Sequence, residues 1–401
     1  PRTCCLGSGV VSKPKIENIV KPSTYFFQMN SSVTSTTPST PSSTKTCLFF
    51  TESTESDFHL LGGKGASLAS MSLANLPVPV GFCVTTNAYL QFLVESGITE
   101  ELMKKVESID CSNLRELDAC SEEIRGMILE KPMPISVEEQ IKTYYKELCE
   151  KCGADNDLPV AVRSSANAED LPDASFAGQQ DTYLWVVGED EVLAHVRKCW
   201  ASLFTSRAIN YRRNQQIAET DVLMCVVIQK MVNARTAGVA MTLNPTNGDR
   251  SKIVIDASWG LGEAVVSGEV TPDNFLVDKI MLSIITASIQ NKHIEHVPDK
   301  ANRKVMTLEI EGERATQPSL SDDEVKEVCR MAKIIEKHYK CPQDIEWAIA
   351  ADLPAGQNFT LLQSRPETVW SQKKPASAPA ATQFGMQGLV STLMNPLAHK
   401  K

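Results

Sequence analysis

The chain has 401 residues, of which 42% are hydrophobic and 22% are charged, and its formal net charge is −9. This composition is typical of a globular protein that is large enough for two or three domains. The acidic balance argues against a general binder of nucleic acid or of membrane surfaces, and no apolar run reaches the ~18 residues of a membrane-spanning helix. Any anion that the protein binds must therefore be held by a local cluster of positive side chains.

Residues 1–46 differ from the rest of the chain. Ser, Thr and Pro make up nearly all of residues 31–46, a composition that cannot bury enough apolar surface to fold. The first 51 residues carry a charge of +4, which leaves −13 on the remainder. We expect a disordered leader, which is either an organelle transit peptide or a linker or untranslated segment upstream of Met29. Because the chain opens on Pro1, we also expect a fragment.

From residue 47 onward the pattern predicts alternating strands and helices. A short strand "TCLFFT" precedes a helix over residues 63–74, and a second strand precedes a helix that begins near Thr86. Residues 98–150 show several amphipathic helical segments. The buried strand "LPVAVRSSA" is expected to end at Arg163, and one long helix is expected from about Glu189 to Arg213.

The second half of the chain is richer in predicted strands. Three strands are predicted in "VLMCVVIQKMV", "TAGVAMTLNP" and "SKIVIDASWGLGE", and residues 270–318 resemble strands and loops. Ser321 and Glu324 form the capping box of a helix in "SDDEVKEVCRMAKIIEKHY". Two strands, 343–350 and 358–366, close the domain. The Pro-, Ala-, Ser- and Lys-rich residues 371–401 are interpreted as an interdomain linker.

The twelve cysteines do not form a metal-binding pattern. Cys149 and Cys152 form the one C-x-x-C pair, and a zinc site would need a second pair at suitable spacing. We therefore expect reduced thiols, as in an intracellular protein, and a cytoplasmic location unless the leader targets an organelle.

The first candidate for function is Lys64, in "LLGGKGASLASM". Glycines allow the backbone to approach a ligand closely, and the lysine places one positive charge there. The spacing is not that of the Walker A phosphate-binding loop. A solvated lysine in a turn is the alternative interpretation.

The second candidate lies in "VRSSANAEDLPDASFAGQQDTYL", residues 162–184. Arg163 follows an apolar strand, where a guanidinium is costly unless it pairs with an anion. Ser164 and Ser165 add hydroxyl groups, and Gly178 and Thr182 belong to a polar stretch suited to closing over phosphates. The alternative is an acidic surface loop with an Arg–Asp salt bridge.

The third candidate lies on the two closing strands. If these strands form a hairpin, Glu346 and Gln363 share one face, with Arg365 beside Gln363. A carboxylate and an amide oxygen suit Mg²⁺ that already carries phosphate oxygens, and Arg365 would neutralise charge on a transferring group. The alternative is a polar patch on an exposed sheet face. The glycine loop "GLGEAVVSGEVTPDNF" (260–275) is a weaker signal, because it lacks the third glycine and the downstream acid of a dinucleotide site.

Together these stretches resemble the ATP-binding domain of the pyruvate phosphate dikinase and phosphoenolpyruvate synthase family, which includes rifampicin phosphotransferase. The similarity covers about residues 57–370 in the family's order, and its form is most similar to the rifampicin phosphotransferases. The matching stretches are "LGGKGASLASM", "VPVGFCVTTNAY", "VAVRSSANAEDLPDASFAGQQDTYL", "IQKMV…AGVAMTLNP", "GLGEAVVSGEVTPDNF" and "DIEWA…LLQSRP".

The resemblance implies an α/β (α+β), ATP-grasp-like domain with two lobes that close on Mg-ATP. We expect the N-terminal lobe over residues 47–240 and the C-terminal lobe over residues 241–370. In this family a phosphoryl group passes from ATP to a histidine on a separate swivelling domain, and then to pyruvate, rifampicin or another small-molecule acceptor. The phosphohistidine domain would belong to the parent chain or act in trans.

The resemblance also assigns roles to single residues. Lys64 and Arg163 would hold phosphates, and Gly178 and Thr182 would lie in the loop that covers them. Gln229 would face the adenine or the ribose.

Metal binding and transfer are assigned to the closing strands. Glu346 and Gln363 would hold Mg²⁺, and Arg365 would contact the phosphate undergoing transfer. Lys64, Arg163 and Arg365 are thus the expected catalytic residues. The roles agree with the physics of phosphoryl transfer, which needs mainly positioning and charge neutralisation.

The sequence departs from the family pattern at two points. The segment "ADLPAGQN" between the closing strands is several residues longer than usual, and none of the six histidines lies in the glycine- and Ser/Thr-flanked setting of the phosphohistidine. Two hypotheses stay open: an ATP half-reaction that uses a histidine domain supplied elsewhere, or a stand-alone ATP-binding or regulatory module without transfer activity.

Overall fold

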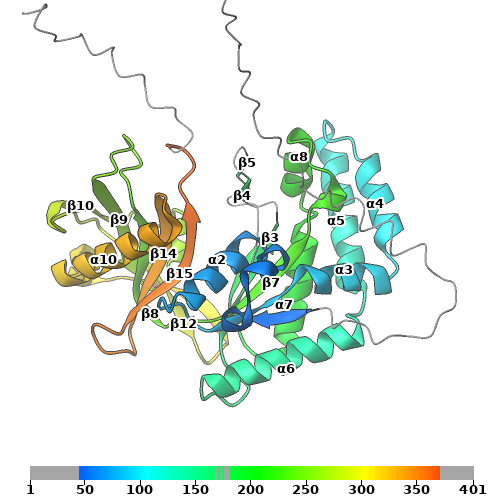
Figure 1. The fold of residues 1–401 in the computed structure, drawn as a ribbon, viewed down its shortest axis with the longest axis horizontal. Helices are drawn as coiled ribbons and strands as arrows, with labels where there is room; N and C mark the ends of the chain where they lie inside the picture. The colour runs from blue at the N-terminus through cyan, green and yellow to red at the C-terminus, as the bar shows by residue number, and fades with distance from the viewer. Residues whose placement is uncertain (1–44, 168–169, 172–173, 176–180, 371–401) are drawn as a thin grey trace, which may run out of the picture.

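The computed structural model describes residues 45–167, 170–171, 174–175 and 181–370. Two antiparallel sheets with flanking helices form two lobes that meet along the middle of the molecule (Figure 1). This is the mixed α/β, two-lobed architecture expected from the sequence. The expected linker, and the leader up to residue 44, lie outside the described residues.

The N-terminal lobe is built on a five-stranded sheet with the order β1-β2-β7-β3-β6. Its central strand β7 is apolar on both faces, because alternate residues enter two different cores. The strands are β1 (Cys47–Phe49), β2 (Gly81–Val84), β3 (Val160–Ala166), β6 (Thr182–Val186) and β7 (Met224–Lys230). The helices are α2 (Gly62–Leu73), α3 (Thr86–Glu95), α4 (Thr99–Ser108), α5 (Leu114–Glu130), α6 (Ile135–Lys151), α7 (Glu189–Ser202) and α8 (Ser206–Asn214), with short 3₁₀ turns η1 (Phe50–Glu52), η2 (Glu55–Leu60) and η3 (Glu219–Asp221).

The C-terminal lobe is built on a six-stranded sheet with the order β11-β10-β9-β8-β14-β15. It begins at Ala234, so β8 already belongs to this sheet, a few residues before the boundary expected at 240/241. The strands are β8 (Ala234–Met241), β9 (Lys252–Trp259), β10 (Asp273–Asp278), β11 (Ile284–Ser288), β14 (Gln343–Ala350) and β15 (Phe359–Pro366). Around them lie α9 (Glu263–Val266), α10 (Asp322–Tyr339), η4 (Gly312–Thr316) and the hairpin of β12 (Ile294–Asp299) and β13 (Lys304–Glu309). A separate short ribbon pairs β4 (Asp170–Leu171) with β5 (Ala174–Ser175).

Helix α2 packs against both sheets. Its buried face shares one core with β2 and β7 of the first sheet and with the second sheet and α10. Ser67 on α2 donates its hydroxyl to the carbonyl of Ser364 on β15 at 2.7 Å and also contacts the Tyr339 hydroxyl at the end of α10. These contacts of α2 hold the lobes together, in addition to the chain segment from Lys230 to Ala234 that joins them.

Several predicted elements are confirmed and two need correction. The capping box of α10 is present, with Ser321 and Glu324 bonded reciprocally. The helix expected from Glu189 to Arg213 is instead two helices, because Ser121 and Arg212 donate to the carbonyls of Phe204 and Leu203, where the helix would continue. Thr205 then caps the new helix through its hydroxyl.

The second correction concerns β3, which continues beyond Arg163 to Ala166. The two serines that follow Arg163 are buried in the strand, and each of them has a hydrogen-bond partner there. Ser164 donates its hydroxyl to the Asp181 carbonyl, and Ser165 donates to the Leu61 carbonyl. Arg163 therefore sits mid-strand.

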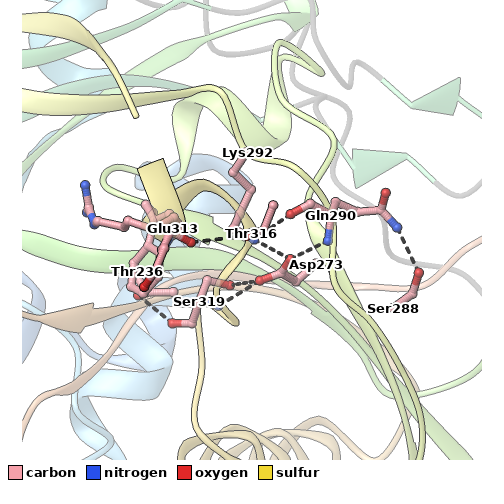
Figure 2. Close-up of polar contacts among 10 residues, drawn as sticks. Thr236, Asp273, Ser288, Gln290, Lys292, Glu313, Thr316 and Ser319 are labelled. Atoms are coloured by element: carbon pink, nitrogen blue, oxygen red, sulfur yellow. Dashed lines mark hydrogen bonds and ion pairs between the residues drawn. The ribbon is translucent and has the colours of Figure 1, made fainter. Parts of the chain in front are cut away.

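A buried ion pair lies at the start of β10 in the second sheet (Figure 2). The ammonium group of Lys292 lies 2.6 Å from the carboxylate of Asp273, and both side chains are fully buried. Ser319 donates to the second oxygen of Asp273 through its backbone nitrogen and its hydroxyl, each at 2.7 Å. Its carbonyl accepts the hydroxyl hydrogen of Thr236 at 2.9 Å, so the network ends on β8, the strand that follows the connection between the lobes.

Within the described ranges, no helix is long and apolar enough to cross a membrane. The cysteines that the structure describes, Cys149 and Cys152 among them, are free thiols.

Candidate active site

A cavity of about 390 Å³ lies between the two sheets, against the segment that connects them. Both lobes and the connection contribute to its walls. It is lined by all but one of the residues to which the family resemblance assigns a role, namely Lys64, Arg163, Thr182, Gln229, Glu346, Gln363 and Arg365. The exception, Gly178, lies outside the described residues.

Lys64 lies in the first turn of α2 rather than in a loop. Gly62 has φ +65°, and a Cβ atom there would come within 2.2 Å of the Ser165 carbonyl oxygen. The hydroxyl of Ser165 accepts the backbone N–H of Gly65 at 3.1 Å. The glycines therefore let the start of α2 approach β3 closely, and this contact places Lys64 in the cavity wall.

The position of Lys64 opposes the helix dipole. The first turn of a helix carries a partial positive charge, and an anion is favoured there over a cation. A lysine in this turn therefore gains no stabilisation from the helix dipole. It adds to the positive charge with which this part of the cavity would meet an anion.

Glu346 and Gln363 lie opposite each other in the β14–β15 hairpin, as the alternation of the strands predicted. The longer connection between the strands does not disturb this pair. The register shifts immediately afterwards, where Trp347 pairs with Leu361 and Leu362 has no partner. The carbonyl of Leu362 instead accepts a hydrogen bond from Arg163 at 2.9 Å.

Arg163 connects the two sheets inside the cavity. It extends from β3, and its Nη2 lies 2.7 Å from the amide oxygen of Gln363 and 3.1 Å from the carboxylate of Glu346. Arg163 is only 8% exposed. Arg365 approaches the other carboxylate oxygen of Glu346, at 3.7 Å. Glu346 thus lies between two guanidinium groups.

Asp344 lies beside the site, next to Arg365 and Glu346, and the sequence analysis did not single it out. It precedes Glu346 by two residues on β14, and its carboxylate lies 3.8 Å from Nε of Arg365. Burial raises the pKa of Asp344 above its ordinary value, and the nearby Glu346 adds to this rise while Arg365 opposes it. Its Oδ1 is buried and has no hydrogen-bond partner in the described part of the chain. The sequence signal for Asp344 was its position two residues before Glu346 in "DIE", which places both acidic side chains on the same face of a strand.

Part of the cavity wall is apolar. Met231 and Val232, from the connection between the lobes, line it together with Leu184 and Ala348. Gln229 also lines the cavity, close to the end of β7; it is 2% exposed and donates weakly to the Pro79 carbonyl at 3.4 Å. The connection was not recognised as part of the site from the sequence, because its residues carry no charge that marks them.

The glycine loop after β9 also reaches the cavity. Leu261, Gly262 and Glu263 line its wall. Gly260 has φ +76°, and its close approach to the His296 carbonyl holds the loop against β12. The loop that the sequence left as a weak signal is therefore part of the cavity wall.

Comparison with known proteins identifies the family to which this arrangement belongs. Residues 58–385 match the family described as "Pyruvate phosphate dikinase, AMP/ATP-binding domain". The chain belongs to this family. The similarity to the pyruvate phosphate dikinase and phosphoenolpyruvate synthase family that the motifs indicated is confirmed.

Curated relatives of this dikinase-family chain are named phosphoenolpyruvate synthases. A probable phosphoenolpyruvate synthase of Staphylothermus marinus is 45% identical over 83% of the chain and 42% of the relative. The phosphoenolpyruvate synthase of Aeropyrum pernix is 43% identical over 79% of the chain and 41% of the relative. That of Pyrococcus furiosus is 39% identical, over 82% and 44% respectively. The chain thus spans about two fifths of the length of these relatives, and the particular likeness to rifampicin phosphotransferases stays a prediction.

Proposed function

We propose that the cavity binds Mg-ATP and that the domain carries out the ATP half-reaction of a dikinase-type phosphotransferase. A phosphoryl group would pass from ATP to a histidine on a separate domain, in the parent chain or in trans. The observation that carries this proposal is the convergence of Lys64, Arg163 and Arg365, which come from distant parts of the sequence, on one cavity whose wall is partly apolar.

The cavity matches the two chemically different ends of ATP. The apolar part of its wall, which includes the connection between the lobes, suits a purine base, and Gln229 would face the adenine or the ribose. The same wall carries the positive side chains of Lys64, Arg163 and Arg365 against the ~4 negative charges of a triphosphate. Thr182, which lies opposite Arg163 in the β3–β6 pairing, would close over the phosphates.

The donor set also fits a magnesium ion that arrives with phosphates. The described residues contain no group of three or more His, Cys, Asp or Glu side chains suited to hold a metal by themselves. Glu346 and Gln363 supply hard oxygen ligands, and Asp344 precedes Glu346 by two residues on the same strand. When bound, the metal would neutralise phosphate charge. The protein's own contribution would be to fix the direction of the phosphates through Lys64, Arg163 and Arg365.

The phosphoryl acceptor would have to be supplied from outside the described cavity. None of the residues that line it there is a histidine. Because the chain spans two fifths of relatives named phosphoenolpyruvate synthases, we further propose that the parent protein is a phosphotransferase of this type, with a small-molecule final acceptor.

Replacing Lys64 or Arg365 with Ala is expected to weaken ATP binding about 10- to 100-fold. The loss of one charged contact to a phosphate costs roughly 1.5–3 kcal/mol, which corresponds to this range. Displacement of a fluorescent ATP analogue in the presence of Mg²⁺ measures the change.

Lys326→Ala is the matched control, because Lys326 pairs with Asp323 on the surface of α10, away from the cavity. It should bind ATP like the wild type. Equal affinities in all four proteins would contradict the assignment of the phosphate contacts. If ATP binds but no phosphate reaches an added histidine domain of a related synthase, the module would be an ATP binder without transfer activity.

A further inference from the structure

The side chain of Arg163 is hydrogen-bonded to both residues that are expected to hold the metal. Its Nη2 contacts the amide oxygen of Gln363 at 2.7 Å and the carboxylate of Glu346 at 3.1 Å. These are the oxygen atoms that would face Mg²⁺. A guanidinium group in this position is a fixed positive charge that competes with any other cation for the same ligands.

The same side chain bridges the two lobes. Arg163 belongs to β3 in the first sheet, whereas Glu346, Gln363 and Leu362 belong to β14 and β15 in the second sheet. The hydrogen bonds that Arg163 donates to these residues therefore all cross from one sheet to the other. The Leu362 carbonyl is available because the bulge removes it from the ladder between the two strands.

The guanidinium group is incompletely satisfied in this arrangement. Its Nε is buried and has no hydrogen-bond partner among the described residues. A buried donor without a partner raises the free energy of the state that contains it. A phosphate oxygen in the cavity would supply both the acceptor and the negative charge that Nε lacks, so ligand binding favours movement of the arginine away from Glu346 and Gln363.

We propose that Arg163 is an internal cation that keeps the metal ligands occupied and the two lobes connected until nucleotide phosphates draw it away. This inference rests on the proposed Mg-ATP site. Free Mg²⁺ is then excluded, and the metal enters with ATP. Arg365, at 3.7 Å from Glu346, stays beside the carboxylate when Arg163 leaves, so Glu346 is not left without positive charge.

The test is Mn²⁺ binding to the full chain in the absence of nucleotide, measured by the electron paramagnetic resonance signal of free Mn²⁺. Arg163→Met should bind Mn²⁺ about tenfold tighter than the wild type or better, because a fixed positive charge has been removed from beside the ligands. The same variant should bind ATP more weakly. Equal Mn²⁺ affinity in the wild type and in a folded Arg163→Met protein would overturn the proposal.

Two controls separate this effect from a general change in charge. Arg235→Met removes an arginine that pairs with Glu324 and does not line the cavity, so Mn²⁺ affinity should stay at the wild-type value. Adding Glu346→Gln to Arg163→Met should abolish the gain. A gain that persists in the double variant, or that Arg235→Met reproduces, would overturn the proposal.

Folding is checked by near-ultraviolet circular dichroism. If Arg163→Met does not fold, Arg163→Gln keeps a neutral hydrogen-bond donor for Glu346 and should show the same gain. Because the Mn²⁺ titration contains no nucleotide, its result is independent of ATP binding. A wild type that binds ATP while neither variant gains Mn²⁺ affinity would overturn this inference alone. A wild type that binds no ATP would overturn the proposed function.

Discussion

Replacing Lys292 with Met is expected to lower the free energy of unfolding by about 3–5 kcal/mol, because the substitution leaves the carboxylate of Asp273 buried without its positive partner. Both side chains of this pair are fully buried. Met has nearly the volume of Lys, so the decrease in the free energy of unfolding would come from the missing positive charge and not from a cavity. Urea unfolding followed by circular dichroism measures the change.

Lys252→Met is the matched control. Lys252 pairs with Asp278 at 3.0 Å, but the two side chains are 24% and 25% exposed. Removal of such a partly solvated pair should cost at most about 1 kcal/mol. The double variant Lys292→Met with Asp273→Asn should recover part of the loss, since the uncompensated charge is gone. A loss in Lys292→Met no larger than in Lys252→Met would contradict the role of the buried pair.

Replacing Gly62 with Ala is expected to destabilise the protein by roughly 2–5 kcal/mol, since the added methyl group meets the backbone of β3 and the residue must keep a left-handed conformation. The φ angle is +65°, and the new Cβ would lie 2.2 Å from the Ser165 carbonyl oxygen. Relief of this clash must move the first turn of α2 and with it Lys64. We therefore expect weaker ATP binding as well as a lower free energy of unfolding.

Gly126→Ala provides the comparison within a helix. Gly126 lies in α5, and a Cβ atom there meets nothing within 4 Å. This substitution should raise the free energy of unfolding by about 0.5–1 kcal/mol, because Ala has the higher helix propensity. If both glycine variants were equally stable, the close approach of α2 to β3 would not be needed for the fold.

The local geometry of the site could be predicted from the sequence because it depends on alternation within strands. Glu346 and Gln363 face each other as expected, since both strands are strongly apolar at the flanking positions and the register follows from burying them. Arg365 lies two residues after Gln363 on β15, so the two side chains lie on the same face of the strand. The resemblance to a known family added the order of the motifs and the expectation of two lobes.

Contacts between distant segments could not be predicted in this way. The pairing of Arg163 with Glu346 joins residues 183 positions apart, and it depends on how the two sheets face each other. The division of the helix after Leu203 depends on hydrogen bonds from Ser121 and Arg212, which no local pattern shows. The shift of register at Leu362, which frees a carbonyl for Arg163, is equally invisible in the sequence.

Isothermal titration calorimetry of the full chain with ATP, with and without Mg²⁺, tests the central claim most directly. We expect one binding site per chain and tighter binding when Mg²⁺ is present, because Glu346 and Gln363 can hold the metal once phosphate oxygens complete its ligands. Titration with Mg²⁺ alone should give little heat. A folded protein that binds no ATP under either condition would contradict the assignment of the cavity as a nucleotide site.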